Sequence, residues 1–125
     1  MNYYKLNTTF KSILADTFTP VSLYLKLRDK FPNSILLESS DYHGNEDSFS
    51  YICCKPIAGI KAENEILTTS FPDGSVITKQ ITKSTSVPDE IQAFANHFEA
   101  EKTDFKFITN GLFGYIAYDA VRYFE

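Results

Sequence analysis

The chain has 125 residues, of which 43% are hydrophobic and 22% charged, so it is long enough for one domain with its own core and too short for two. Its formal net charge is -4 and its lysines and arginines do not cluster, which excludes nucleic acid as a partner. The absence of any run of about 20 apolar residues excludes a membrane-spanning helix. The alternating first ten residues are unlike a signal peptide, so we expect a cytoplasmic protein.

The N-terminal part begins with a predicted strand and continues into a helix. The first ten residues place every second side chain on one face, formed by Tyr4, Leu6, Thr8 and Phe10. Thr19 then provides an N-cap and Pro20 the first position of a helix. The apolar spacing that follows continues to Phe31, and Pro32 ends the helix.

Two strands joined by a polar turn are predicted next. Residues 34–40 contain the apolar run Ile35-Leu36-Leu37, which indicates a buried strand, and Glu38 follows this run directly. Residues 41–47 form the polar turn. Residues 49–54 are aromatic, β-branched and thiol-rich, as expected of a partner strand that returns through the core.

The remainder predicts an antiparallel meander followed by further helices. Strand-like segments at 57–62, 66–71 and 76–81 are separated by turns at 64–65 and 72–75. A second helix follows Pro88, and its apolar face consists of Ile91, Phe94, Ala95 and Phe98. The fold class is therefore α+β (α/β), with antiparallel sheets and two or three helices.

The C-terminal residues predict short elements that end abruptly. Residues 105–108 and 111–118 are expected to be strands, and Asp119 to cap a third helix. That helix is barely one and a half turns long at Glu125, and a helix so short is marginal unless it packs or continues. We therefore expect the chain to be part of a longer protein.

The cysteines and histidines predict no catalytic or metal site. Cys53 and Cys54 are neighbours that would point to opposite faces of a strand, so we expect two buried thiols in a reducing cytosol rather than a disulfide. His43 lies in the polar turn, where we expect it to be solvated. We expect His97 to lie on the second helix, either at its surface or half-buried, and neither histidine has an obvious Cys, Ser or Asp partner nearby in sequence.

Glu38 is the local feature that points to a ligand site. A carboxylate placed directly after a buried apolar run is costly unless it is paired or solvated. One interpretation is that Glu38 emerges into water at the strand end or pairs with a basic side chain. The other is a pocket in which Glu38 holds a cation and Ser39 a hydrogen bond, with Ser50 and Tyr51 as neighbours on the returning strand.

Four blocks of the sequence resemble the N-terminal region of anthranilate synthase component I. They are residues 14–28 (LADTFTPVSLYLKLR), 36–39 (LLES), 49–52 (FSYI) and 111–125 (GLFGYIAYDAVRYFE), and they occur in the family's order and at similar spacing. The resemblance spans nearly the whole chain. It implies that residues 1–125 are a regulatory N-terminal domain, and that the C-terminal chorismate-binding catalytic domain is absent.

The resemblance also implies a ligand, partners and a reaction. Glu38, Ser39 and Ser50 would bind L-tryptophan as a feedback inhibitor, although two positions depart from the usual pattern, with Ser48 in place of a basic residue and Cys53 in place of a glycine. The full enzyme would make anthranilate and pyruvate from chorismate and glutamine-derived ammonia. Its glutamine amidotransferase subunit would be a partner. Its catalytic residues and Mg²⁺ would lie outside this fragment, which would have no cofactor of its own and no activity alone.

Two alternatives to this function stay open. The homologous aminodeoxychorismate synthase component I shares the fold, although relatives of that type more often carry Asp than Glu before the serine, so that Glu38 favours the first interpretation. The other alternative is an interaction domain that docks the glutaminase subunit and binds no ligand.

Overall fold

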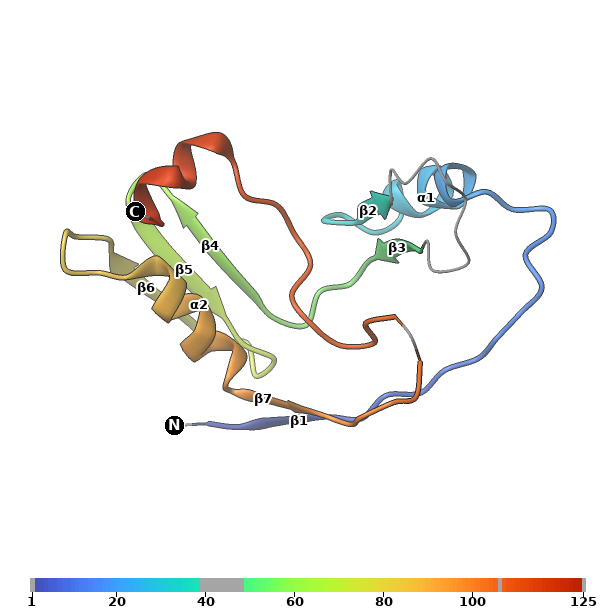
Figure 1. Cartoon of the computed structure of the whole chain (residues 1–125), viewed down its shortest axis with the longest axis horizontal. Helices are drawn as coiled ribbons and strands as arrows, with labels where there is room; N and C mark the ends of the chain where they lie inside the picture. The colour runs from blue at the N-terminus through green and yellow to red at the C-terminus, as the bar shows by residue number, and fades with distance from the viewer. Residues whose placement is uncertain (1, 39–48, 106, 125) are drawn as a thin grey trace. The chain divides into compact units, whose positions relative to one another are not determined.

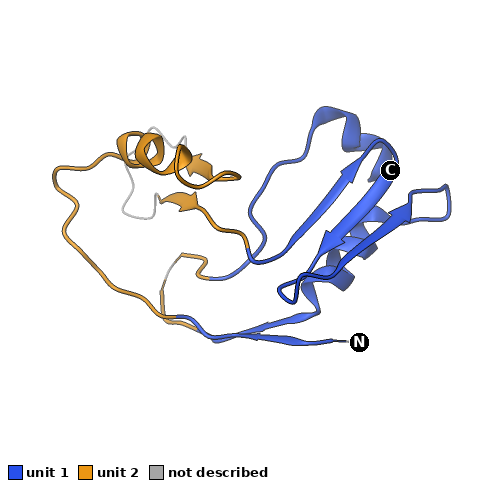
Figure 2. Ribbon diagram, turned by 180° about the vertical axis from the view of Figure 1, so that it is seen from behind, with its two compact units in different colours: residues 1–8, 57–102, 110–125 blue, residues 9–56, 103–109 orange. Residues whose placement is uncertain are grey.

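The computed structural model describes residues 2–38, 49–105 and 107–124, which form two compact units (Figure 2). Unit 1 comprises Met1–Thr8, Ile57–Lys102 and Asn110–Glu125, and unit 2 comprises Thr9–Pro56 and Thr103–Thr109. Each unit is therefore built from segments that lie far apart in sequence. The predicted α+β class is confirmed, with small antiparallel sheets, one parallel strand pair and three helices.

The three-stranded sheet of unit 1 is the predicted meander (Figure 1). Its strands are β4 (Gly59–Glu63), β5 (Ile66–Ser70) and β6 (Val76–Gln80), antiparallel in the order β4-β5-β6. Asn64 and Glu65 form the two-residue turn between β4 and β5, with φ values of 52° and 61°. Two left-handed residues match the twist of the flanking strands, which explains why so short a turn suffices.

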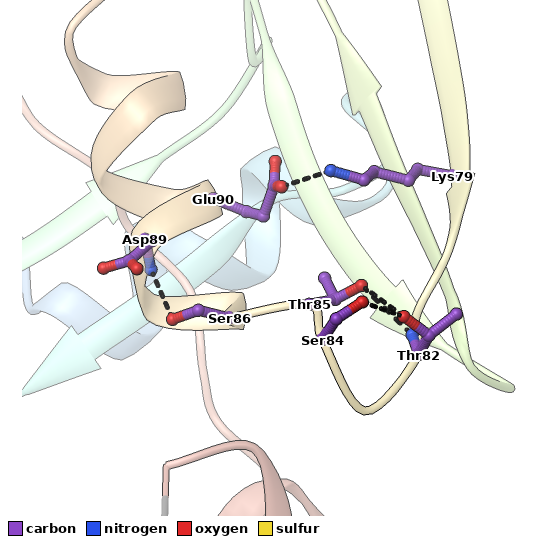
Figure 3. A network of polar contacts seen from close by, with 7 residues as sticks. All are labelled: Lys79, Thr82, Ser84, Thr85, Ser86, Asp89 and Glu90. Atoms are coloured by element: carbon purple, nitrogen blue, oxygen red, sulfur yellow. Dashed lines mark hydrogen bonds and ion pairs between the residues drawn. The ribbon is translucent and has the colours of Figure 1, made fainter.

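Helix α2 (Val87–Ala95) packs on this sheet. The side chain of Ser86 caps the helix by accepting a hydrogen bond from the Asp89 backbone N–H at 3.4 Å, and Lys79 of β6 pairs with Glu90 at 2.6 Å (Figure 3). The core cluster consists of Leu67, Ile81 and Val87, with Ile60, Ile91 and Tyr123 packed against it. The helix ends at Ala95, so the prediction that Phe98 belongs to it is wrong.

Phe98 instead begins a strand that pairs with the N-terminus of the chain. Strands β1 (Tyr4–Leu6) and β7 (Phe98–Ala100) are parallel, with Tyr4 opposite Phe98 and their rings stacked at 5.6 Å. The prediction of one long strand over the first ten residues is therefore wrong in its length. The pairing joins residues more than 90 positions apart, and no local pattern signals such a contact.

Residues 111–124 differ from the prediction. No strand forms over 111–118, and the last element is a 3-10 helix, η1 (Tyr118–Tyr123), whose N-cap is Ala117 rather than Asp119. Tyr115 and Tyr118 are each 91% exposed, and no described strand pairs with the segment whose aromatic pattern indicated a strand. The described residues of 105–108 likewise form no strand.

Unit 2 contains a helix and a β-hairpin. Its elements are α1 (Pro20–Arg28), β2 (Ile35–Glu38) and β3 (Ser50–Cys53). Thr19 and Ser22 form a reciprocal capping box, since each backbone N–H donates to the other's hydroxyl at 3.1 Å, which confirms the predicted helix start. The helix ends at Arg28, earlier than predicted, and the chain turns at Asn33 (φ 67°) before entering β2. None of the described helices has the length and apolar character needed to cross a bilayer.

Candidate functional site

The hairpin of unit 2 brings Glu38 and Ser50 together. Strands β2 and β3 are antiparallel, and Glu38 at the end of β2 lies directly opposite Ser50 at the start of β3. Directly opposed residues project from the same face, with Cβ atoms about 5 Å apart. Two of the three predicted site residues therefore share one face at one end of the hairpin. Ser39 lies outside the described residues, as do Ser48, His43 and the predicted turn at 41–47.

The register also separates Tyr51 from this face. Tyr51 pairs with Leu37, one position along from the Glu38–Ser50 pair. Successive residues of a strand point to opposite faces, so the Tyr51 side chain lies on the face away from Glu38. The prediction that Tyr51 neighbours Glu38 is therefore wrong for its side chain.

Glu38 and Ser50 are both exposed, and their exposure decides what the carboxylate can do. The structure matches the interpretation in which Glu38 emerges into water, because the charge needs no buried partner to be stable there. Among the described residues, Glu38 takes part in no ion pair. The ion pairs that form there join Arg28 to Asp29, Lys61 to Glu63 and Lys79 to Glu90. The carboxylate is thus accessible to a cationic group, with the Ser50 hydroxyl beside it.

Two side chains that flank Ser50 contact a segment that the sequence did not link to the hairpin. The backbone N–H of Ile108 donates a hydrogen bond to the Tyr51 hydroxyl at 3.1 Å, and the rings of Phe49 and Phe107 lie 5.5 Å apart. The one signal available in the sequence was the pair of aromatic residues Phe105 and Phe107 in a short segment, which was interpreted as a strand.

The surroundings of the two cysteines and of His97 indicate structural roles for these residues. Cys53 is half-buried, and burial and then the neighbouring Cys54 raise the pKa of its thiol, which keeps that thiol protonated. Cys54 is exposed, so the prediction of two buried thiols is wrong for it. His97 is half-buried, but it lies beyond the end of α2 at Ala95, so its predicted place on the helix is wrong. Its Nδ1 is 2.7 Å from the Asn2 carbonyl oxygen. Within the described ranges, no three His, Cys, Asp or Glu side chains are grouped to hold a metal ion.

Two hollows in unit 1 offer fewer polar groups for binding a ligand than the hairpin does. One, of about 240 Å³, is lined mainly by apolar side chains such as Leu6, Phe94 and Phe98, and its polar side chain, Asn110, already donates to Thr8 at 2.8 Å. The other borders the hydroxyl-rich turn before α2, where Thr82 bonds Ser84 and Thr85 (Figure 3). These hydroxyls satisfy one another and shape the turn, so we place the candidate site at Glu38 and Ser50.

Comparison with known proteins agrees with the resemblance seen in the sequence. The chain is 33% identical over 126 aligned residues to anthranilate synthase component 1 of Lactococcus lactis subsp. lactis, and 36% identical over 118 residues to that of Thermus thermophilus, with 92% of the chain aligned in each case. It is 27% identical over 123 residues to the Aquifex aeolicus protein, with 98% of the chain aligned. No family model and no solved structure matches it.

The chain spans about a quarter of the length of these relatives, 23% to 24% of each. It is homologous to the N-terminal quarter of anthranilate synthase component 1.

Proposed function

We propose that this chain is the regulatory, tryptophan-sensing N-terminal domain of an anthranilate synthase component 1. The homology supports the assignment to this part of the protein. The observation that carries the sensing role is the register that sets Glu38 opposite Ser50 on one face of the hairpin. The family resemblance implies the same two residues as ligand contacts, and Ser39 belongs to the proposal through its place in the sequence.

The chemistry of the pair suits a free amino acid. The Glu38 carboxylate accepts charge-assisted hydrogen bonds from the α-ammonium group of L-tryptophan, and these are the strongest polar contacts available to it. The Ser50 hydroxyl both donates and accepts, so it can bind the α-carboxylate or the ammonium. Leu36 and Ile52, which are the next residues along the same face, offer apolar surface for the indole ring.

Regulation requires that tryptophan bind one state of the whole enzyme better than another. In the proposed full-length protein, the ligand would bias a chorismate-binding domain, located outside these 125 residues, away from its active form. That domain would carry the catalytic residues and Mg²⁺, and it would release anthranilate and pyruvate from chorismate and glutamine-derived ammonia. In this proposal, the role of residues 1–125 is to bind the inhibitor.

Calorimetric titration of the chain with L-tryptophan tests the sensing role. We expect saturable binding that Glu38→Gln weakens by about tenfold to a hundredfold, since the substitution keeps the side-chain shape but removes the charge that holds the ammonium. Glu99→Gln is the matched control, because Glu99 is also an exposed glutamate on a strand but lies on β7. Equal affinities of the two variants would contradict the assignment of Glu38.

A docking role is a second candidate, because residues 111–118 expose a run of apolar side chains. Leu112 is 51% exposed, Ile116 70%, and Tyr115 and Tyr118 each 91%. Exposed apolar patches of this kind commonly mark interfaces. The proposed partner is the glutamine amidotransferase subunit, and sedimentation of the two proteins together tests it. A complex that survives Tyr115→Ser combined with Ile116→Ser would rule out this surface.

The reaction product separates the two homologous enzymes. If the chain acts within an anthranilate synthase, the full-length protein, supplied with chorismate, Mg²⁺ and ammonia, releases anthranilate, which is detected by its fluorescence. Formation of aminodeoxychorismate instead would assign the chain to the folate-pathway homologue. The same assay with added tryptophan shows whether the ligand inhibits, and Glu38→Gln should then relieve that inhibition.

A further inference from the structure

The segment 103–109, here called the loop 103–109, belongs to unit 2 and is described at residues 103–105 and 107–109. The hydroxyls of Thr103 and Thr109 lie 3.2 Å apart, which joins the two ends of the segment. Compact loops with their ends held together in this way are packed by their own side chains and often have functional roles. Most of the sequence between this loop and the hairpin folds into unit 1, so only the tertiary structure places the loop beside β3.

The loop holds β3 on both sides of Ser50. Phe107 contacts Phe49, with ring centroids 5.5 Å apart and an interplanar angle of 59°. Ile108 donates its backbone N–H to the Tyr51 hydroxyl at 3.1 Å. Phe49 and Tyr51 are the residues immediately before and after Ser50, so two independent contacts fix the backbone that carries the Ser50 side chain.

The contacting ring is itself held in place. Phe105 stacks on Phe107 at 4.8 Å with an interplanar angle of 18°, and it meets the edge of Phe10 at 4.9 Å with an angle of 88°. Offset-stacked and edge-to-face arrangements are the favourable geometries for aromatic pairs. Phe10, Phe105, Phe107 and Phe49 therefore form a continuous series of ring contacts that ends beside Ser50.

We propose that the loop 103–109 is a positioning element for the Glu38–Ser50 site. It acts from behind the strand, because Tyr51 follows Ser50 in β3 and therefore points to the opposite face. Tyr51 and Phe107 thus need not touch a ligand; they hold Ser50 opposite Glu38. Because binding effects are reciprocal, a ligand that requires this register also stabilises the loop. The identity of that ligand rests on the proposed function, whereas the effect of the loop on the strand does not.

Amide hydrogen exchange on the free chain tests the mechanical part of the proposal. Tyr51→Phe keeps the ring and removes the hydroxyl that accepts from Ile108. We expect the Ile108 amide and the hydrogen-bonded amides of β3 to exchange about fivefold faster, the change that corresponds to one lost hydrogen bond. Tyr118→Phe is the matched control, since this ring is 91% exposed in unit 1. Faster exchange at Ile108 with unchanged β3 amides would overturn the proposal.

Titration with L-tryptophan tests the effect on the site. We expect Tyr51→Phe to weaken tryptophan binding about fivefold and Phe107→Leu to weaken it as well. Phe107→Tyr retains the aromatic ring, so we expect it to bind tryptophan with the affinity of the unmodified chain. Bound tryptophan should also slow exchange of the Ile108 amide. If the unmodified chain binds tryptophan and all of these variants bind it equally well, the positioning role is overturned but the proposed function is not. No binding by the unmodified chain would contradict the proposed function, while the exchange of the β3 amides still decides whether the loop holds the strand.

Discussion

The Tyr4 hydroxyl donates a hydrogen bond to the Asp73 carboxylate at 3.1 Å, which ties the N-terminal strand to the turn between β5 and β6. Asp73 also accepts from the hydroxyl of Ser75 at 2.6 Å and from its backbone N–H at 2.8 Å. These bonds from Ser75, with a smaller contribution from Tyr4, lower the pKa of the Asp73 carboxyl below its usual value. The ionised carboxylate is thus the form that the turn requires.

We expect acid to weaken unit 1 through Asp73. Because the folded chain lowers the pKa of this carboxyl, its contribution to stability is present above the unfolded pKa of about 4 and is lost as the pH falls through the folded value. Melting temperatures measured between pH 7 and pH 2 should fall less steeply for Asp73→Asn than for the unmodified chain. Asp104→Asn, at an exposed site in unit 2, serves as control, and parallel curves for all three proteins would contradict the prediction.

Gly74 should resist substitution for a conformational reason. Its φ of 88° lies in the left-handed region, and its N–H donates to the Phe71 carbonyl oxygen at 2.9 Å. Gly74→Ala is expected to cost about 1 to 2 kcal/mol of unfolding free energy through backbone strain, since open space surrounds the new Cβ. Gly114→Ala is the control, because Gly114 has equal space and no positive φ. Denaturant unfolding should separate the two, and equal stabilities would show that strain at Gly74 is absent.

Leu67 and Ile66 are neighbours on β5 that should differ sharply in their importance. Leu67 is 3% exposed and belongs to the core cluster, whereas Ile66 is 43% exposed. Leu67→Ala should cost about 2 to 5 kcal/mol of unfolding free energy, because it removes buried methyl groups and leaves a cavity. Ile66→Ala should cost under about 1 kcal/mol, as is usual for surface changes. Similar losses in chemical denaturation would contradict the placement of the core.

Thr19 should stabilise helix α1 through its capping box. Thr19→Ala removes the acceptor for the Ser22 backbone N–H, and a lost cap of this kind typically costs about 1 kcal/mol. Thr19→Ser should retain most of that stability, because it keeps the hydroxyl. Circular dichroism during thermal unfolding measures the effect, with Thr17→Ala as the control outside the helix. Equal melting temperatures for the Thr19→Ala and Thr19→Ser variants would show that the cap does not stabilise the helix.

Local signals account for the parts of the fold that were predicted correctly. The capping pattern at Thr19 and Pro20 acts within one helical turn, and the meander from β4 to β6 needs only turns between adjacent strands. The β2–β3 hairpin was expected from two apolar runs on either side of a polar segment, and its register then set Glu38 opposite Ser50. Two of the three predicted site residues, Glu38 and Ser50, became neighbours because they end and begin consecutive strands.

Errors arose where the partner of a segment lies far away in the sequence. The aromatic run at 111–118 was interpreted as a strand, but in this structure no strand pairs with it, and Tyr115 remains exposed. Phe98 continues the helical spacing of α2, yet it pairs with Tyr4, because strand β1 lies alongside it as a parallel partner. The propensity of a segment describes which secondary structure it can adopt, and its tertiary contacts decide which one it forms.

Apart from Ser50, which the family resemblance implied, the sequence alone indicated the capped start of α1, strands β2 to β6, the turns between neighbouring strands, and Glu38 and Ser39 as candidate ligand residues. These depend on interactions within a few positions, whose geometry follows from side-chain chemistry. It was the tertiary fold that turned Tyr51 away from Glu38, paired β1 with β7 and brought the Ile108 N–H to the Tyr51 hydroxyl. The last two of these contacts join residues separated by 50 positions or more, and which pairs meet depends on how the whole chain closes its loops and covers its apolar surface.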